Sequence, residues 1–371
     1  MPDKVAIYRG VSYAQPSLSR ALEKLSRDID LNFLKGAKRV LLKPNLISAR
    51  PPEDAATTHP AVVEAVCSVL RDFGIEIIIG DSSAVVLFGG TREAFRVCGI
   101  EEAAKKFGAM LVAFETSKRV ERKIPGGLYL ESVSLPAEVE EADFIINLPK
   151  LKTHTLTVYT GAVKNLFGLV SNPERIRLHR EADAEQFCAA LLDVYSAVKP
   201  RLSIMDGILA HEGNGPTAGS PLEAGVLAAA ADALALDWTL CRMAGLGPKV
   251  NPMMNIAARR GLVPAHSITG DGEFPLRLKK PLTVFERAPG FLRSFVMLGA
   301  VPKIKFNRGK CVKCGECALK CPAGAITLSP YPELSAEKCV RCFCCHEVCP
   351  VQAVELKDGF PFNLVRRLRG G

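Results

Sequence analysis

A cysteine motif that occurs twice constrains this chain more than any other feature of its sequence. Residues 311–328 and 339–356 align at an offset of 28, as CVKCGECALKCPAGAITL and CVRCFCCHEVCPVQAVEL, and both contain the pattern C-x2-C-x2-C-x3-C-P. Eight of the eighteen aligned positions are identical. This identity indicates an internal duplication, so we expect the segment to fold as two copies of one small unit.

The cysteine spacing is typical of proteins that bind two 4Fe-4S clusters. In such proteins the first three cysteines of a motif bind one cluster and the fourth binds the other. We therefore expect two 4Fe-4S clusters with crossed ligand sets. The first cysteine set is Cys311, Cys314, Cys317 and Cys349, and the second cysteine set is Cys339, Cys342, Cys345 and Cys321. Structural zinc sites or a thiol framework are the alternative, because thiolates also bind zinc.

The distribution of cysteines favours metal ligation over disulfides. Nine of the thirteen cysteines lie between Cys311 and Cys349 in a long chain without a recognisable export signal, which indicates a reducing compartment. Cys344 is the ninth, and we interpret it as a spare thiol near the second cluster, or else as an alternative ligand. We expect the adjacent His346 at the surface or as a donor to cluster sulfur. The other four cysteines are expected to be small core residues: Cys67, Cys98, Cys188 and Cys241.

Residues 1–270 alternate short β-branched runs with helical patterns, which is typical of parallel βαβ construction. The fold class that follows is α/β, a layered domain with a mostly parallel sheet. We expect strands at 5–8, 39–42, 75–80, 109–114, 143–148, 202–205 and 225–229. We expect helices at 17–28, 60–73, 92–97, 101–107, 184–198 and 233–244, and a β-hairpin at 124–135.

The rest of the chain divides into a linker and a second domain. Residues 271–303 are basic and contain proline, and residues 304–371 are expected to form a small α+β, ferredoxin-like iron–sulfur domain. The segment from Glu273 to Lys310 contains nine Lys or Arg residues and two Glu residues. Such a stretch suits an acidic protein, an anionic membrane surface or nucleic acid, although a solvated linker is the simpler interpretation. No nucleic-acid-binding motif accompanies the charge, so we expect no nucleic-acid partner.

The sequence also bears on the location of the protein. Its first residues, MPDKVAIYRG, show neither a basic region followed by an apolar stretch nor a cleavage site. No uncharged apolar stretch approaches the roughly 20 residues that span a bilayer. We expect a cytoplasmic protein without a transmembrane segment.

Polar side chains follow several of the predicted strands. In open parallel sheets, ligands bind beyond the carboxyl ends of the strands, so these side chains are expected to converge on one edge. They are Lys43 and Asn45; residues 81–83; Lys150, Lys152 and His154; Lys164 and Asn165; and Asp206 with the loop 211–215. Lysines and amide donors suit a phosphate or carboxylate ligand. The alternative is an ordinary basic loop.

For catalysis, we assign roles from residue type and expected position. His154 is the candidate proton donor or acceptor near neutral pH, and Asp206 is expected to position a substrate or a metal. Negative charge would be stabilised by Lys43, Lys152 and Lys164. Asp232 and Asp237 are candidate metal ligands together with His154 or His211, and helix capping or a solvated position explains them at least as well. Neither a P-loop nor a G-x-G-x-x-G turn between a strand and a helix occurs, so no nucleotide site is indicated.

Six separated motifs resemble a known family. They are VLLKPNL at 40–46, THP at 58–60, GDSS at 80–83, DFIINLPKLKTH at 143–154, TGAVKNLFG at 160–168 and IMDGILAHEGNGPTAG at 204–219. Together with the cysteine-rich tail, the chain resembles the prokaryotic family called domain of unknown function 362, fused to a bacterial-type two-cluster ferredoxin domain. The resemblance covers nearly the whole chain. It implies an α/β domain joined to an iron–sulfur domain, without an agreed reaction.

Three functions are compatible with these features. The first is an iron–sulfur oxidoreductase, or its electron-delivery component, that acts on an anionic small molecule held by the α/β domain. The second is a ferredoxin-like carrier without catalytic activity that docks a redox partner protein. The third is a non-redox enzyme whose clusters are structural. We expect the first, with a redox partner protein, and leave open whether the chain is itself an enzyme.

Overall fold

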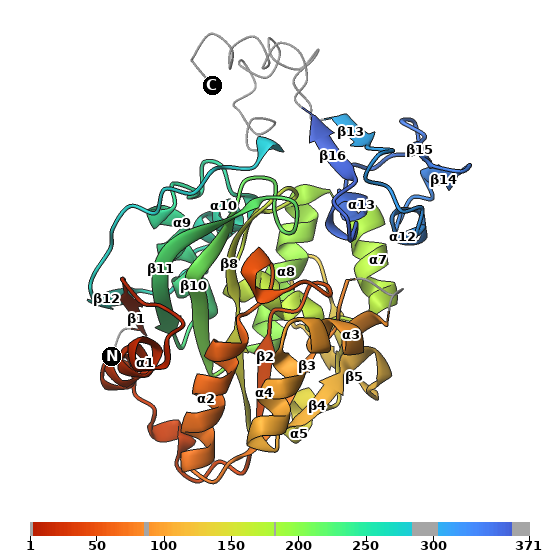
Figure 1. Ribbon diagram of the computed structural model, residues 1–371. Helices are drawn as coiled ribbons and strands as arrows, with labels where there is room; N and C mark the ends of the chain where they lie inside the picture. The colour runs from red at the N-terminus through yellow and green to blue at the C-terminus, as the bar shows by residue number, and fades with distance from the viewer. Residues whose placement is uncertain (1–2, 85–88, 182, 284–302, 358–371) are drawn as a thin grey trace.

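A ten-stranded sheet forms the centre of the α/β domain in the computed structural model, which describes residues 3–84, 89–181, 183–283 and 303–357 (Figure 1). Eight strands lie side by side in the order β12 (His266–Gly270), β1 (Asp3–Tyr8), β11 (Ser220–Ala230), β10 (Leu202–Glu212), β7 (Phe144–Leu148), β2 (Arg39–Pro44), β3 (Glu76–Asp81) and β4 (Met110–Ala113). Two further strands lie off this path: β8 (Lys150–His154) pairs with β10 and β9 (Val158–Thr160).

The sheet is mostly parallel, which confirms the predicted fold class. The run β10, β7, β2, β3 and β4 is parallel throughout, and β12 is parallel to β1. Two exceptions occur: β11 pairs antiparallel with both β10 and β1, and β9 pairs antiparallel with β8. Because β11 returns beside β10 after a short loop, it reverses direction within the sheet.

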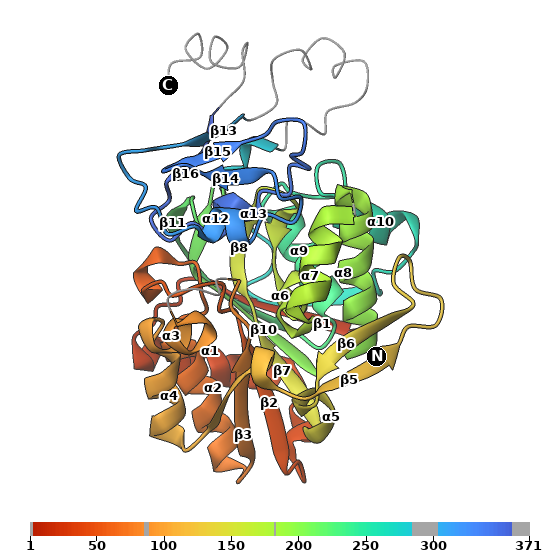
Figure 2. The same cartoon turned by 90° about the vertical axis from the view of Figure 1, so that its right-hand side faces the viewer.

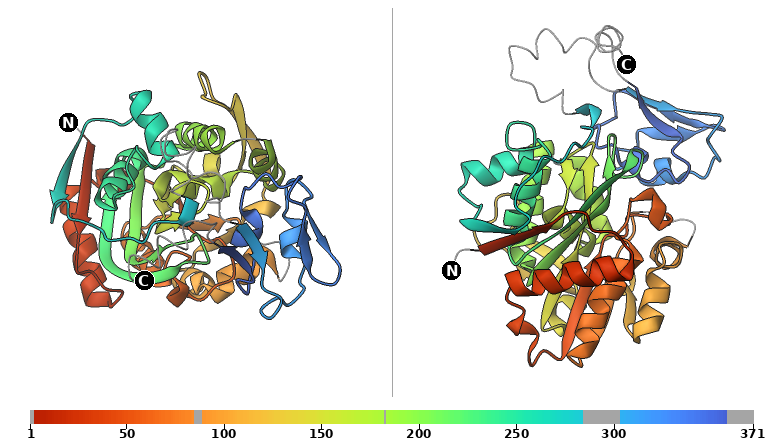
Figure 3. Two further views of the ribbon diagram at one scale, coloured as in Figure 1. Left: turned by 90° about the horizontal axis from the view of Figure 1, so that it is seen from above. Right: turned by 60° about the vertical axis from the view of Figure 1, so that its left-hand side comes forward.

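Helices cover both faces of the sheet (Figure 3). Alternate residues of β2 point to opposite faces, so Leu41 belongs to one hydrophobic core and Leu42 to the other. The core around Leu42 is completed by α1 (Gln15–Asp28), α2 (Pro60–Asp72), α3 (Gly90–Val97) and α4 (Ile100–Phe107). The core around Leu41 is completed by α8 (Ala184–Val198), α9 (Ala233–Met243), α10 (Pro252–Arg259) and the hairpin of β5 (Arg119–Lys123) and β6 (Ser132–Pro136).

Short elements connect these layers. The short helices are α5 (Glu138–Glu141), α6 (Ala162–Asn165) and α7 (Asn172–Glu181). The 3-10 helices are η1 (Asn32–Leu34), η2 (Pro52–Asp54), η3 (Phe114–Thr116) and η4 (Leu166–Leu169).

The sequence-based expectations for secondary structure are largely confirmed, with three kinds of difference. Strand β10 extends to Glu212, beyond the expected 202–205. The hairpin pairs 119–123 with 132–136, so most of the expected range 124–135 is its connection. Strands β8, β9 and β12 and helices α5, α6, α7 and α10 were not predicted.

The iron–sulfur module, residues 303–357, contains two short antiparallel strand pairs and two short helices, which confirms the expected α+β domain. The strand pairs are β13 (Lys303–Phe306) with β16 (Val354–Lys357), and β14 (Ile326–Leu328) with β15 (Pro332–Leu334). The helices are α12 (Glu316–Leu319) and α13 (Cys344–Glu347), which are separated by the same offset of 28 residues as the two motifs.

The duplication extends to the backbone. Lys313 and Arg341, at equivalent positions, both have positive φ, at 58° and 53°. The fourth cysteine of each motif accepts a backbone N–H from the alanine four residues later: Ala325 donates to Cys321 Sγ at 3.2 Å, and Ala353 donates to Cys349 Sγ at 3.1 Å. Each copy therefore holds its fourth thiol in the same way.

The segment after β12 packs on the α/β domain instead of forming a solvated connection. Leu276 and Leu278 are buried in the core, and the N–H of Lys279 donates to Glu212 Oε2 at 2.8 Å. The remainder of the expected linker, 284–302, lies outside the described residues, as do 358–371 of the expected second domain. Within the described ranges, no helix combines the length and apolar character needed to cross a membrane.

We predict that Asp193 of α8 is needed for stability. Its buried carboxylate accepts three consecutive backbone N–H groups from the connection between β5 and β6, at 2.7, 2.7 and 2.8 Å. Asp193→Asn places an amide against those donors, and we expect the free energy of unfolding to fall by about 2 to 4 kcal/mol. Urea denaturation measures this change.

Asp183→Asn is the matched control in the same helix. Asp183 is the N-cap of α8, where asparagine serves as well as aspartate, so we expect a change of less than about 0.5 kcal/mol. Equal losses for the two variants would contradict the role given to Asp193.

Candidate functional site

A cavity of about 120 Å³ lies where the carboxyl ends of β2 and β3 meet the iron–sulfur module. Figure 2 shows the module above the sheet, with α12 and α13 toward the α/β domain. The α/β domain contributes the lining residues Lys43, Asn45, Asp81, Lys164, Asn165, Arg175 and His179. The module contributes Lys320, Pro322, Cys344 and Glu347. This volume corresponds to roughly four water molecules of liquid, so it suits a small ligand.

A buried ion pair between β2 and β3 forms the floor of this cavity. Lys43 Nζ lies 2.7 Å from Asp81 Oδ1, and both side chains are almost completely buried. Burial lowers the pKa of Lys43, and the charge of Asp81 opposes this shift. A Cβ atom at Gly168 would lie 2.2 Å from Asp81 Oδ1, so only glycine allows η4 to pass this close to the pair. The predicted convergence of Lys43 and Asp81 is therefore present, although Asp81 compensates the charge of Lys43.

Two other cations at the cavity lack a carboxylate partner within the described ranges. Lys164 forms no ion pair or side-chain hydrogen bond there, and burial lowers its pKa while Glu347 opposes the shift. Arg175 donates to the Ser82 hydroxyl and to Asn172 Oδ1, but its buried Nε has no acceptor. Burial lowers the pKa of Arg175 to about 10, so the guanidinium stays charged at neutral pH.

His154 joins the α/β domain to the module instead of lining the cavity. Its Nδ1 accepts the N–H of Leu156 at 2.9 Å and of Thr157 at 3.3 Å, which places the ring proton on Nε2. Nε2 lies 3.1 Å from Oε1 of Glu347 in α13. Burial lowers the pKa of His154 to about 4, so the imidazole is neutral at neutral pH. A pKa this low does not favour the expected exchange of protons by His154 near neutral pH.

Lys152 is completely buried behind the cavity. Its Nζ donates to Asn45 Oδ1 at 2.6 Å and to the carbonyl of Ala56 at 2.7 Å, and it has no carboxylate partner among the described residues. Burial, together with the charges of Lys164 and Lys150, lowers its pKa well below the usual range. Lys152 therefore does not contact a ligand in the cavity. It positions the side chain of Asn45, which lines the cavity.

A chain of amides extends from Lys152 along the cavity wall. Asn45 Nδ2 donates to Asn165 Oδ1 at 2.9 Å, and Asn165 Nδ2 donates to Asn147 Oδ1 at 2.8 Å. Because each carbonyl oxygen accepts from the preceding donor, the orientation of every amide is determined by its neighbour. The chain thus positions Asn45 and Asn165, which both line the cavity.

Asp206 lies outside the cavity, contrary to the expectation that it positions a substrate or a metal. Its carboxylate in β10 is completely buried and pairs with Lys150 Nζ at 2.8 Å. It also accepts the Tyr13 hydroxyl at 2.8 Å and the N–H of His59 at 2.9 Å. These donors occupy the carboxylate, so Asp206 links β10, β8 and the start of α2.

The other two candidate acids stabilise helix starts. Asp232 accepts the N–H of Ala235 as the N-cap of α9, which confirms the capping interpretation. Asp237 is not a solvated acid: it is completely buried and accepts the N–H groups of Ala162 and Val163 at 2.7 and 2.8 Å. It therefore holds the first turn of α6, which carries Lys164.

The loop between β10 and β11 contacts the iron–sulfur module instead of cradling a ligand. Thr217 Oγ1 donates to the carbonyl of Glu347 at 3.0 Å, and Gln352 Nε2 donates to the carbonyl of Thr217 at 3.0 Å. His346 is buried, with Nε2 3.1 Å from the carbonyl oxygen of Asn214, so neither expectation for its position is met. From a different loop, Arg50 Nη2 donates to the carbonyl of Cys349 at 3.1 Å.

The cysteines of the module gather in two places. A small cavity of about 20 Å³ is lined by Cys311, Cys314, Cys317 and Cys349, which are the first cysteine set. Burial raises the pKa of Cys345 well above its usual range, and nearby Cys342, Cys317, Cys339 and Cys321 add to the shift. No three His, Cys, Asp or Glu side chains in the described ranges are placed to hold a single metal ion, whereas in a 4Fe-4S cluster each thiolate binds a different iron.

Four ionisable residues of the cavity were not predicted from the sequence: Arg175, His179, Lys320 and Glu347. Arg175 and His179 lie four positions apart in α7, so they share one face of a helix that was not predicted. A signal for Glu347 was available in the duplication, because the equivalent position in the first copy is Leu319. Leu319 is 57% exposed whereas Glu347 is buried, which reverses the usual preference of both residue types.

We predict that Asp206→Asn destabilises the fold and leaves anion affinity at the cavity unchanged. Removing one partner of a buried ion pair leaves Lys150 uncompensated, which costs about 3 to 5 kcal/mol. Urea denaturation and anion titration measure the two effects. As a control, Glu273→Gln breaks the exposed pair with Arg242 and is expected to cost about 0 to 1 kcal/mol. A stable Asp206→Asn variant with weakened anion binding would contradict this assignment.

Comparisons with known proteins agree with the architecture. The family described as domain of unknown function (DUF362) matches residues 40–242, and the 4Fe-4S binding domain matches residues 304–327. The thylakoid-associated protein sll1697 of Synechocystis is 36% identical over 294 residues, which cover 76% of this chain and 87% of that protein.

Two solved structures share part of the fold at low similarity. A Thermotoga maritima protein, structural genomics target VR152, has a TM-score of 0.38 and 15% identity, over 55% of this chain and 52% of that chain. The lactate racemase apoprotein of Thermoanaerobacterium thermosaccharolyticum has a TM-score of 0.37 and 13% identity, over 61% of this chain and 53% of that chain. The chain thus spans about half the length of each.

The DUF362 match covers more than half of the chain, and the cyanobacterial relative aligns over most of both proteins. The 4Fe-4S match includes three cysteines of the first cysteine set and begins at β13. The chain therefore belongs to the DUF362 family and carries a 4Fe-4S binding domain after its α/β domain.

Proposed function

We propose that this protein is an iron–sulfur oxidoreductase, or the electron-delivery component of one, that exchanges electrons with a small anion. The 4Fe-4S binding domain gives the chain an iron–sulfur electron-transfer role. The observation that supports the finer proposal is the cavity whose lining comes from both the α/β domain and the iron–sulfur module. A molecule bound there would contact both parts of the chain at once.

The proposal includes two 4Fe-4S clusters, one for each cysteine set. The cavity lined by the whole first set supports this number, as does the proximity of the second set around Cys345. The equivalent N–H bonds to Cys321 and Cys349 support two similar sites. Bound clusters supply one-electron chemistry, and N–H donors to the cysteine sulfurs are among the features that set their potentials.

An anionic ligand is proposed because the side chains that line the cavity carry an excess of positive charge: Lys43 is paired with Asp81, and Glu347 is the other acid of the lining. Lys164 and Arg175 have no carboxylate partner among the described residues, and Lys320 adds a third cation from the module. Arg175 also presents a buried donor, Nε, without an acceptor. A carboxylate or phosphate group would supply acceptors for these donors and charge for these cations. Lys164 and Arg175 would also stabilise negative charge that develops on the ligand.

The path from the second cysteine set to the ligand is short. Cys344 and Pro322 line the cavity, and each is directly bonded to a residue of that set, Cys345 and Cys321 respectively. Adjacent Cα atoms are about 3.8 Å apart, so the ligand would lie within a few residues' reach of the thiolates. We propose that electrons pass between this set and the bound anion.

A redox partner protein completes the proposal, because electrons must come from outside the chain or leave it. We also propose a cytoplasmic location, since the thiols of an iron–sulfur protein need a reducing compartment. The printed name of the Synechocystis relative associates that protein with thylakoids. Fractionation of cells into soluble and membrane-bound protein would distinguish the two locations for this chain.

We predict that Arg175→Met weakens binding of small carboxylates and phosphates by roughly 10- to 100-fold, because a charged hydrogen bond contributes about 1.5 to 3 kcal/mol. The measurement is anaerobic calorimetric titration of the reconstituted protein, with EPR spectra of the reduced clusters recorded at each step. We expect the bound anion to change these spectra.

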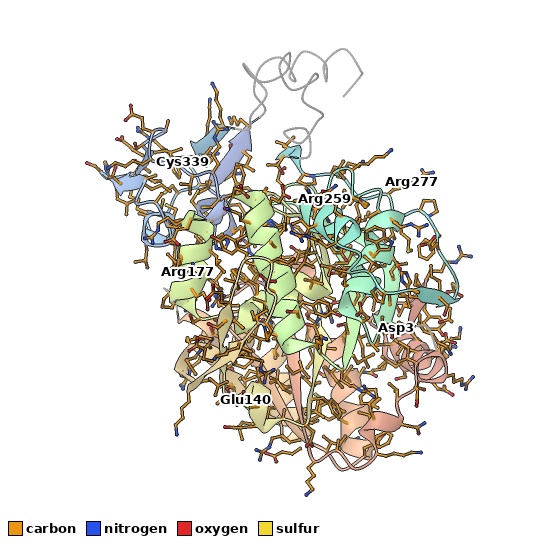
Figure 4. All side chains as sticks on the ribbon, turned by 180° about the vertical axis from the view of Figure 1, so that it is seen from behind. Asp3, Glu140, Arg177, Arg259, Arg277 and Cys339 are labelled. Carbon is orange, nitrogen blue, oxygen red and sulfur yellow. The ribbon has the colours of Figure 1, made fainter. Side chains whose placement is uncertain are left out.

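Arg177→Met is the matched control. Arg177 lies on the same helix, below the module that carries Cys339 (Figure 4), and is 43% exposed. We expect its affinity to match that of the native protein. Anion binding that leaves the EPR spectra unchanged, with turnover that survives loss of iron, would instead support a non-redox enzyme with structural clusters.

We also predict that Cys317→Ala and Cys345→Ala each remove about half of the bound iron, because each cysteine belongs to a different four-thiolate set. Cys344→Ala is the control within α13 and should retain all the iron. Iron analysis together with EPR of the reduced protein measures this. Loss of iron from Cys344→Ala, or no loss from Cys317→Ala, would contradict the assigned sets.

A further inference from the structure

The two cysteine sets have different surroundings within the module. The second set adjoins the cavity at the α/β domain, through the neighbouring residues Pro322 and Cys344. The cavity of the first set is lined instead by side chains that are open to solvent: Val312 is 59% exposed, Leu328 43% and Val351 36%. The first set therefore faces outward, and the second set faces the proposed ligand.

These three side chains, Val312, Leu328 and Val351, define an outer face of the module. Five of the nine large hydrophobic residues that are exposed in the described part of the chain lie in the module, and three of those five are on the outer face. Exposed apolar side chains that gather at one place mark an interaction site. Their position around the first cysteine set places that site next to a proposed cluster.

The iron–sulfur module carries more basic than acidic residues, and one lysine adjoins the outer face. Residues 303–357 contain nine Lys or Arg and five Asp or Glu, and two of the acids, Glu316 and Glu347, are buried. Lys313 directly follows Val312, lies 4.7 Å from the Tyr331 ring centroid and forms no ion pair among the described residues. An apolar face beside a lysine without an ion pair, on a module with an excess of basic residues, suits a partner whose surface is acidic.

We propose that an acidic electron-carrier protein docks on the outer face, so that electrons enter the chain at the first cysteine set and continue through the second set to the cavity. This inference rests on the proposed electron-transfer function and is independent of the anionic ligand. In each encounter the reduced carrier loses one electron and the oxidised chain gains it. No bond forms or breaks and no proton moves. Electrons therefore pass through the module from the outer face toward the α/β domain.

The internal duplication provides a matched pair of variants. Lys313 and Arg341 occupy equivalent positions, both with positive φ, next to the exposed residues Val312 and Val340. Lys313→Glu reverses a charge at the outer face, whereas Arg341→Glu makes the same reversal beside the second set. The two substitutions have the same net charge change and the same backbone requirement, and they adjoin different cysteine sets; Lys313→Glu also removes the contact with the Tyr331 ring.

The test uses the full chain with reconstituted clusters and a flavodoxin of strongly negative net charge as the probe. We expect the native protein to bind the probe at 20 mM salt and to lose at least tenfold in affinity at 300 mM salt, because steering charges are screened. Lys313→Glu should weaken binding at low salt at least tenfold, and Arg341→Glu by less than about twofold. Flavin fluorescence measures binding, and stopped-flow reduction by the reduced flavodoxin should show the same order.

A second pair of variants tests the apolar part of the outer face. Val312→Ser should slow the transfer of electrons from reduced flavodoxin several-fold, and Val340→Ser should leave it unchanged. EPR of each reduced variant shows whether both clusters are intact. Slower transfer with intact clusters indicates a docking defect, whereas loss of a cluster signal indicates a folding defect.

Several results would overturn the inference. Equal losses for Lys313→Glu and Arg341→Glu, a larger loss for Arg341→Glu, or binding without salt dependence would each place the docking site elsewhere. Failure of the flavodoxin to bind the native, cluster-loaded protein would also overturn the inference. If these results occur while EPR shows two reducible clusters, only the docking inference fails. Absence of cluster signals from the native protein would instead contradict the proposed function.

Discussion

The docking of the iron–sulfur module on the α/β domain is the contact on which the rest of the arrangement depends. It places the carboxylate of Glu347 3.1 Å from the imidazole of His154, and both side chains are buried. Neither His154 Nε2 nor Glu347 Oε1 has a hydrogen-bond partner in the described part of the chain, so the hydrogen bonds that hold the two parts together come from other residues. The bonds from Thr217 and Arg50 to the carbonyls of α13 and Cys349 are two of these. The cavity exists only because the module is held in this position.

Buried lysines organise the α/β side of the contact. Lys43 and Lys150 are compensated by Asp81 and Asp206, so they stabilise strand ends rather than a ligand. Lys152 is compensated only by acceptor oxygens, and it determines the orientation of Asn45. Of the α/β-domain cations that line the cavity, Lys164 and Arg175 have no carboxylate partner among the described residues. Their charge is therefore available to a ligand. The tertiary structure thus distinguishes the lysines that stabilise the fold from the cations that face a ligand. The sequence alone does not make this distinction.

Much of the fold was predictable because its signals are local. Strands such as 39–42 are continuous apolar runs, and the cysteine motif repeats at an offset of 28. Strand β8 was missed because its alternate residues Lys150, Lys152 and His154 are ionisable, which is typical of an exposed loop. Here all three are buried by contacts between distant segments. Only the tertiary structure supplies those partners, so no local pattern indicates them.

The candidate site was predictable in part for the same reason. Lys43 and Lys164 were placed at the ligand edge from their positions after strands or glycines, and both line the cavity. Asp206 follows the same rule but lies behind the sheet edge, because β10 continues past it to Glu212. Arg175 and Glu347 come from α7 and from the module, whose approach to the sheet edge depends on the docked arrangement. Sequence position alone carries no information about that arrangement.

The most direct test of the central claim is X-ray diffraction from crystals of the anaerobically purified protein soaked in bromide, with anomalous data at the iron and bromine absorption edges. We predict two iron centres, one beside each cysteine set, and a bromide ion between Lys164 and Arg175. A single iron centre, zinc in place of iron, or bromide bound elsewhere with none in this cavity would contradict the claim.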